Sequence, residues 1–127
     1  MHALIIEDEP LIAIAIEDAL RDYGFTSFDR AENVEEAVAA AVRTCPDLIT
    51  ADVQLHPGSG IEAVKCICSK RAIPVVFITG SPLNVRRDIP SYPLVLKPFS
   101  NLDLESAINL AMPGRCSQPV PANGVID

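Results

Sequence analysis

The sequence is short of basic residues, of long apolar runs and of any leader-like segment. It carries 10 lysines and arginines against 17 aspartates and glutamates, a net charge of −7, whereas a nucleic-acid-binding surface needs a basic footprint. The local basic pair Lys70-Arg71 is interpreted as a solvated helix end. No apolar run approaches the roughly 20 residues that span a bilayer, and no basic region of a signal peptide precedes the first one. We therefore expect no nucleic-acid partner, no membrane partner and a cytoplasmic location.

Cysteine and histidine are also scarce, and their spacing argues against a zinc site or a disulfide framework. Among the four cysteines, Cys66 and Cys68 lie two residues apart within an expected helix. Their side chains then point in different directions and lack the C-x-x-C spacing of a zinc site. The two histidines are far apart in sequence. The thiols are therefore expected to be reduced, as is usual in the cytosol.

What the chain does contain is a fivefold alternation of short apolar runs and helical segments. With 127 residues, 49% of them hydrophobic and 21% charged, it is large enough for one globular domain with an ordinary core. Short apolar strands separated by helices are typical of a parallel sheet covered on both faces. The predicted fold class is α/β, doubly wound. The expected strands are His2–Ile6, Phe25–Asp29, Leu48–Ala51, Val75–Ile78 and Leu94–Leu96.

Capping residues and prolines set the expected helix boundaries. Pro10 suits the first position of a helix, and Asn33 with Glu36 resembles a capping box at the start of the next one. Three prolines between residues 81 and 93 leave room for only a short or irregular fourth helix. The expected helices cover residues 10–23, a segment from 34 that stops before Pro46, Ile61–Ser69, a short stretch within 83–87, and a last helix that follows Ser100 and ends near Met112.

The last residues of the chain read differently from the rest. Residues 113–127 show no periodicity and are rich in proline, glycine, serine and asparagine, which is typical of a flexible end. We expect one domain over residues 1–112, a flexible tail over 113–127, and no output domain within the chain.

Single polar residues stand at the ends of four apolar runs. Glu7 and Asp8 follow the first run, Asp52 the third, Thr79 the fourth and Lys97 the fifth. In an open α/β sheet the carboxyl edge of the strands is where ligands bind. Each residue alone also has an ordinary structural explanation, such as acidic residues favouring a helix N-terminus. Their joint placement is what predicts a functional site.

This set of residues suits phosphoryl transfer to a carboxylate. Crowded carboxylates repel one another unless a cation joins them, and a small number of oxygen ligands suits Mg²⁺. A carboxylate beside such a metal can act as a nucleophile and form an acyl phosphate. Lys97 then supplies positive charge and Thr79 a hydroxyl donor for the phosphoryl group.

Four segments of the sequence resemble the receiver domain of bacterial response regulators, the phosphoacceptor of two-component phosphorelays. The resemblance covers residues 1–112. It implies a flavodoxin-like fold, with five parallel strands in the order 2-1-3-4-5 and helices on both faces. The segments are Leu4-Ile5-Ile6-Glu7-Asp8-Glu9-Pro10, Ala51-Asp52-Val53-Gln54-Leu55, Phe77-Ile78-Thr79-Gly80 and Lys97-Pro98-Phe99.

The resemblance also implies roles for single residues. Asp52 would accept a phosphoryl group from a histidine kinase or a phosphotransfer protein, and Thr79 and Lys97 would hold the phosphoryl oxygens. The bond between Lys97 and Pro98 is expected to be cis. The implied Mg²⁺ ligands are Asp8, Asp52 and the backbone carbonyl of Gln54, with Glu7 acting through a metal-bound water, while Gln54 and Ser81 tune autodephosphorylation.

One position departs from the family pattern. Receivers usually place a tyrosine or phenylalanine three residues before the lysine of the fifth strand as a rotameric switch, and here that residue is Leu94. We therefore expect the signal to leave through a hinge at Thr79-Gly80 and the segment that follows. The run from Pro74 to Gly80 is similar to the PxxFxTG motif of a single-domain, alphaproteobacterial subgroup that lacks this aromatic, and it implies a kinase of the HWE/HisKA2 type.

These observations predict a signalling protein whose only catalysis is its own phosphorylation and autodephosphorylation. Its output would be altered binding to a downstream protein, or relay of the phosphoryl group. Two other functions fit the residues less well. An aspartyl phosphatase would need an acid where Gln54 stands. A degenerate receiver, acting as a phosphorylation-independent binding module, would lack an acceptor-site residue, and all of them are present.

Overall fold

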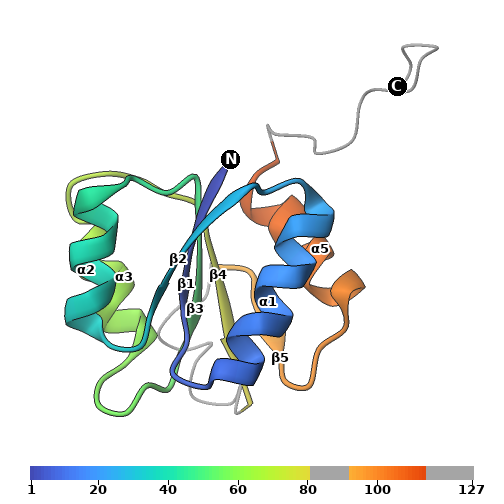
Figure 1. Ribbon diagram of the computed structural model, residues 1–127, viewed down its shortest axis with the longest axis horizontal. Helices are drawn as coiled ribbons and strands as arrows, with labels where there is room; N and C mark the ends of the chain where they lie inside the picture. The colour runs from blue at the N-terminus through green and yellow to red at the C-terminus, as the bar shows by residue number, and fades with distance from the viewer. Residues whose placement is uncertain (81–91, 114–127) are drawn as a thin grey trace.

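Five parallel strands form one sheet in the order β2-β1-β3-β4-β5 (Figure 1). This computed structural model describes residues 1–80 and 92–113. Ser81, the fourth helix expected within 83–87, and the segment 114–127 lie outside the described residues. The predicted strand order and fold class are confirmed. The strands are β1 (His2–Ile6), β2 (Ser27–Ala31), β3 (Leu48–Asp52), β4 (Val75–Thr79) and β5 (Leu94–Leu96).

The order of the strands reverses direction next to β1. The chain passes from β1 outward to β2 and then returns to the other side of β1 with β3, so β1 pairs with both neighbours. In open α/β sheets, the crevice at such a reversal is where ligands bind. The carboxyl ends of β1 and β3 carry the acidic residues singled out above.

Two pairs of helices cover the two faces of the sheet, as Figure 1 shows. Helices α1 (Pro10–Tyr23) and α5 (Asn101–Ala111) lie on one face, and α2 (Val34–Arg43) and α3 (Gly60–Cys68) lie on the other. No described helix is both long and apolar enough to cross a membrane.

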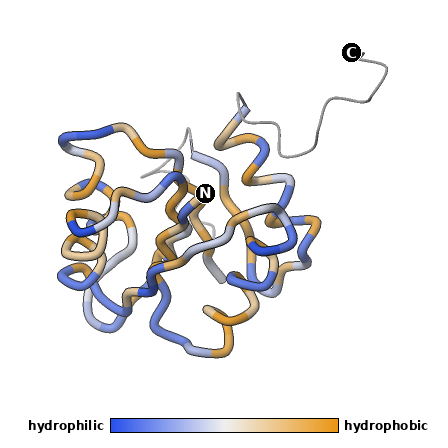
Figure 2. Tube along the Cα trace, turned by 45° about the horizontal axis from the view of Figure 1, so that its top comes forward, coloured by the Kyte–Doolittle hydropathy of each residue, from blue (hydrophilic) through white to orange (hydrophobic). Residues whose placement is uncertain are grey.

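Successive residues of each strand contribute to two separate hydrophobic cores, because side chains alternate between the faces of a sheet. Ala3 and Ile5 pack in the core beneath α1 and α5. Leu4 and Ile6 pack in the core beneath α2 and α3. The central strands therefore read as unbroken apolar runs, and in Figure 2 the strands in the middle of the molecule are drawn mainly in orange.

The second strand was predicted two residues too early. Phe25 lies in the core, with its ring centroid 6.0 Å from that of Tyr23. The predicted strand Phe25–Asp29 included this residue, but the ladder with β1 begins only at the pair His2 and Ser27. β2 is an edge strand of the sheet, and its sequence, Ser-Phe-Asp-Arg-Ala, is largely polar. Its limits are therefore defined by its pairing with β1 and not by an apolar pattern.

The helix caps match the expected residues, with one correction. Ser100 and Asp103 form a complete capping box at the start of α5. Asn33 accepts a hydrogen bond from the Glu36 amide, but the Glu36 carboxylate accepts from the amide of Glu32 instead of returning to Asn33. The start of α2 therefore has the side-chain cap of Asn33 but lacks the return hydrogen bond that would complete a capping box.

Candidate functional site

Backbone hydrogen bonds bring the strand ends into register at the carboxyl edge of the sheet. The Glu7 amide donates to the carbonyl of Ala31 at the end of β2 (2.9 Å), and the Lys97 amide donates to the carbonyl of Thr79 (2.9 Å). Thr79 is the last residue of β4, and Asp52 is the last residue of β3. The structure thus brings the predicted polar residues to one edge.

The ammonium group of Lys97 lies among three carboxylates. Its Nζ atom is 3.0 Å from Oδ2 of Asp52 and 3.4 Å from Oε1 of both Glu7 and Glu9. Burial lowers the pKa of Lys97. The attraction of these carboxylates, above all Asp52, is stronger than this effect and raises the pKa of Lys97 above its usual value. Lys97 is therefore held as a cation at the centre of the site.

Glu7 is a buried carboxylate with incomplete hydrogen bonding. The residue is 2% exposed, and Oε1 has no hydrogen-bond partner among the described residues, although it lies within ion-pair distance of Lys97. The other oxygen accepts from the Glu9 amide (3.2 Å). Burial, together with the nearby negative charge of Asp52, raises the pKa of Glu7 to about 8. Without a further cation, the site favours a protonated Glu7 at neutral pH.

Four carboxylates form a group that could hold a metal ion. Glu7, Asp8, Glu9 and Asp52 each offer one oxygen within 4.8 Å of the others. Four carboxylates outnumber the single ammonium group beside them, and the buried Oε1 of Glu7 accepts no hydrogen bond from the described residues, so a further cation is favourable here. An all-oxygen donor set of this size fits Mg²⁺.

The loop after β3 fixes the orientation of Asp52. The Gln54 amide donates to Oδ1 of Asp52 (3.1 Å), and the Gly60 amide donates to the carbonyl of Val53 (3.1 Å). A Cβ atom on Gly60 would lie 2.0 Å from the backbone oxygen of Asp52. The close approach of α3 to this strand end is possible only for glycine at position 60.

Two residues that lie at the site were not among the residues predicted from the sequence. Glu9 lies beside Lys97 although its side chain is 64% exposed. His56 contacts Asp8 twice, through its backbone amide (3.1 Å) and its ring nitrogen Nδ1 (3.0 Å) to the same oxygen, Oδ2. The acidic run Glu7-Asp8-Glu9 was the available signal for Glu9. A contact between residues 48 apart in the chain left no local signal for His56.

An open cavity of about 380 Å³ gives solvent access to Asp52. Asp52 itself is 4% exposed, so only part of its carboxylate reaches the cavity. At the end of β4, Thr79 is buried and Gly80 lines the cavity wall. The remaining lining residues are Asp8, Glu9, Gln54, His56 and Lys97.

The position of the expected switch aromatic holds a half-buried leucine. Leu94 pairs with Phe77 across β4 and β5 and packs against the core beneath α2 and α3. Two residues earlier, the ring of Tyr92 meets the ring of Phe77 edge-on, with centroids 5.3 Å apart. The bond between Lys97 and Pro98 is cis, as predicted, and so is the bond between His56 and Pro57.

The sheet is parallel with the strand order 2-1-3-4-5, and its carboxyl edge carries an acidic cluster, a buried aspartate and a lysine. This combination of fold and site is typical of a class of bacterial signalling domain. Residues 3–109 match the family model of the response regulator receiver domain. The chain belongs to this family of two-component signalling domains.

Its relatives include regulators from several bacteria. The chain is 37% identical over 115 residues to the transcriptional regulatory protein PdtaR of Mycobacterium tuberculosis, covering 87% of this chain and 56% of PdtaR. It is 39% identical over 114 residues to the phyllosphere-induced regulator PhyR of Methylorubrum extorquens, covering 86% of this chain and 42% of PhyR. The chain thus spans about half the length of these curated relatives.

A solved structure shares the whole fold. The solution NMR structure of the PhyR receiver domain from Erythrobacter litoralis superposes with a TM-score of 0.78 at 34% identity. The match covers 95% of each chain. The architecture described above is therefore that of a receiver domain throughout.

Proposed function

We propose that this chain is a phosphoacceptor receiver in which Asp52 takes a phosphoryl group from a histidine kinase or a phosphotransfer protein. The observation that carries the proposal is the environment of Asp52. Its carboxylate lies in an acidic cluster, 3.0 Å from the Lys97 ammonium group, at the wall of an open cavity. The receiver domain spans residues 1–112 in this proposal, and 113–127 form a tail.

Asp8, Asp52 and the backbone carbonyl of Gln54 would hold Mg²⁺, and Glu7 would act through a metal-bound water. Glu9 joins this set as a further oxygen donor near the same point. Bound Mg²⁺ supplies the positive charge that lets a phosphoryl group approach several carboxylates. The raised pKa of Glu7 fits this assignment, because the Glu7 charge is unfavourable until a second cation joins Lys97 at the site.

In the transfer step, a carboxylate oxygen of Asp52 attacks phosphorus, the phosphorus–nitrogen bond of the donor phosphohistidine breaks, and its imidazole nitrogen leaves with the electron pair. The Gln54 amide and Lys97 hold the two carboxylate oxygens of Asp52 and so fix its orientation. Lys97 and the Thr79 hydroxyl then hold the phosphoryl oxygens. Autodephosphorylation is tuned by Gln54 and by Ser81, which lies outside the described residues.

The phosphorylated chain changes its contacts with a downstream protein or passes the phosphoryl group on. With Leu94 in place of the switch aromatic, the Thr79-Gly80 hinge carries the signal. The strand-4 run Pro74–Gly80 supports a donor kinase of the HWE/HisKA2 type. A cytoplasmic location belongs to the same proposal, supported by the free thiols of Cys45, Cys66 and Cys68.

Acetyl phosphate provides a direct test. The chain is incubated with this donor and Mg²⁺, and the adduct is located by mass spectrometry, with beryllofluoride as a non-transferable analogue. We expect one acid-stable, base-labile phosphoryl group on Asp52, none there in Asp52→Asn, and none when EDTA removes Mg²⁺. If Asp52 never gains a phosphoryl group from acetyl phosphate or from a kinase, the chain is instead a phosphorylation-independent binding module.

A further inference from the structure

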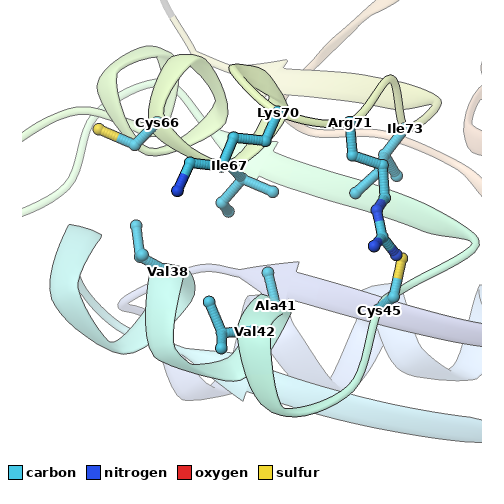
Figure 3. A pocket seen from close by; sticks show the side chains of 9 residues that line it. All are labelled: Val38, Ala41, Val42, Cys45, Cys66, Ile67, Lys70, Arg71 and Ile73. Carbon is cyan, nitrogen blue, oxygen red and sulfur yellow. The ribbon is translucent and has the colours of Figure 1, made fainter.

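A groove between α2 and α3 lies outside the acceptor site (Figure 3). Its volume is about 320 Å³, and it shares no lining residue with the cavity at Asp52. Helix α3 begins beside Asp52 and ends at Cys68, and two cations of the groove, Lys70 and Arg71, follow that far end. The lining residues are Val38, Ala41, Val42, Cys45, Cys66, Ile67, Lys70, Arg71 and Ile73.

The groove exposes apolar side chains to solvent. Val42 projects from α2 with 83% of its surface exposed. Ile67 of α3 and Ile73 are half-buried and complete the apolar lining. Single exposed apolar residues are ordinary, whereas a concave, mostly apolar hollow with a few polar groups at its edge is the usual form of a ligand site.

The groove is positively charged, whereas the chain as a whole is negatively charged. The chain has a net charge of −7, yet Lys70 and Arg71 are the only charged residues among those that line the groove. Within residues 1–80 and 92–113, neither cation has an ion-pair partner. Figure 3 shows Arg71 extending toward Cys45 at one end of the groove, while Cys66 lies at the other end.

We propose that this groove is a docking site for an acidic amphipathic helix of a partner protein. Aliphatic side chains of such a helix would enter the hollow between Val42 and Ile67, and flanking carboxylates would pair with Lys70 and Arg71. A symmetric contact between two copies of this groove would bring the same two cations face to face, so charge disfavours a second copy of the chain as the occupant.

The test uses a synthetic, capped helical peptide with leucines at positions i, i+3, i+4 and i+7 and glutamates on both flanks. Two control peptides replace the leucines by serine or the glutamates by lysine. Each is titrated into the ¹⁵N-labelled, unphosphorylated chain. We expect chemical-shift changes centred on Val42, Ile67 and Arg71 with the acidic leucine peptide, and at least fivefold weaker binding of each control peptide.

Matched variants separate the groove from the rest of the surface. Val42→Ser and Arg71→Glu are each expected to weaken peptide binding at least fivefold. Leu110→Ser removes a similarly exposed apolar side chain from α5, and Lys65→Glu reverses a cation on α3 that does not line the groove. Both controls should stay within twofold of the wild type. Circular dichroism verifies that each variant folds.

Thiol protection gives a second readout. The peptide should slow alkylation of Cys45 and Cys66, which line the groove, but not that of Cys68, which does not. Equal binding of the lysine peptide, shifts centred on α1 and α5, or unchanged alkylation of Cys45 and Cys66 would overturn the proposal. Concentration-dependent shifts of groove residues without peptide would overturn it in favour of self-association. The measurements use no phosphoryl donor, so their outcome is independent of Asp52 phosphorylation.

Discussion

At the scale of single residues, Glu7 is a buried carboxylate whose ionisation is expected to lower the stability of the folded protein. A carboxylate that is 2% exposed, close to Asp52 and incompletely hydrogen-bonded, is unfavourable when ionised. A single lysine, Lys97, serves Glu7, Glu9 and Asp52 together. The proposed Mg²⁺ would add a second positive charge here, so we expect the metal-free protein to be less stable than the metal-bound protein.

Glu7→Gln is expected to stabilise the metal-free protein, increasingly so between pH 4.5 and pH 8. The folded chain keeps the Glu7 proton up to about pH 8, whereas the unfolded chain releases it near 4.5. The unfolded state then binds fewer protons, so the free energy of unfolding of the wild type falls as pH rises, by at most about 1.4 kcal/mol per pH unit from this group. Urea denaturation in EDTA at pH 5, 6.5 and 8 measures the difference.

The exposed Glu62 of α3 supplies the control for this prediction. Glu62→Gln removes one carboxylate from the surface, so it is expected to change the free energy of unfolding by less than about 0.5 kcal/mol at every pH. Parallel pH profiles for the wild type and Glu7→Gln would contradict the assignment of a raised pKa to Glu7.

At the scale of secondary-structure elements, the junction of β3 and α3 depends on one glycine. Because a Cβ on Gly60 would lie 2.0 Å from the backbone oxygen of Asp52, no rotation of a side chain can make room for it. We expect Gly60→Ala to lower the free energy of unfolding by about 1–3 kcal/mol, the range for overpacked interiors, and to displace Asp52. Chemical denaturation and the rate of acetyl-phosphate labelling measure the two effects.

Gly80→Ala is the matched substitution at the same edge of the sheet. A Cβ there meets no described atom within 4 Å, so its effect on the free energy of unfolding should stay below about 0.5 kcal/mol. A Gly60→Ala variant as stable as Gly80→Ala would show that the loop between β3 and α3 adapts freely.

The start of α5 depends on its capping box. Ser100 Oγ accepts from the Asp103 amide (3.1 Å), and the Asp103 carboxylate accepts from the Ser100 amide (2.9 Å). Ser100→Ala should cost about 1 kcal/mol of unfolding free energy, whereas Ser106→Ala, at an exposed position within the same helix, should be neutral or slightly stabilising. Thermal denaturation of the two variants compares them, and equal melting temperatures would argue against the cap.

At the scale of the whole molecule, Mg²⁺ binding is coupled to stability. A ligand that binds only the folded state stabilises it, by about 1.4 kcal/mol at ten times its Kd. We therefore expect MgCl₂ to raise the Tm of the wild type. The Asp8→Asn variant should need at least ten times more MgCl₂ for the same rise in Tm. An equal rise in Asp8→Asn, or no rise in the wild type, would count against the proposed ligand set.

The fold was predictable because its determinants are local or periodic. Apolar runs, prolines and capping residues mark the strands and helices, and parallel strands necessarily bring Asp8, Asp52 and Lys97 to a common edge. The limits of β2 were not predictable, because that edge strand is polar and only its ladder with β1 defines it. The contact of His56 with Asp8 likewise depends on where a loop folds back.

The sequence by itself determined the α/β class, the strand order through its resemblance to receivers, and the residues at the strand ends, because each follows from pattern and residue type. Only the tertiary structure decided how these groups interact. Three carboxylates share Lys97, burial raises the pKa of Glu7, and α2 and α3 leave a basic, apolar groove between them. These properties depend on distance and burial, which packing sets and which the sequence pattern does not specify.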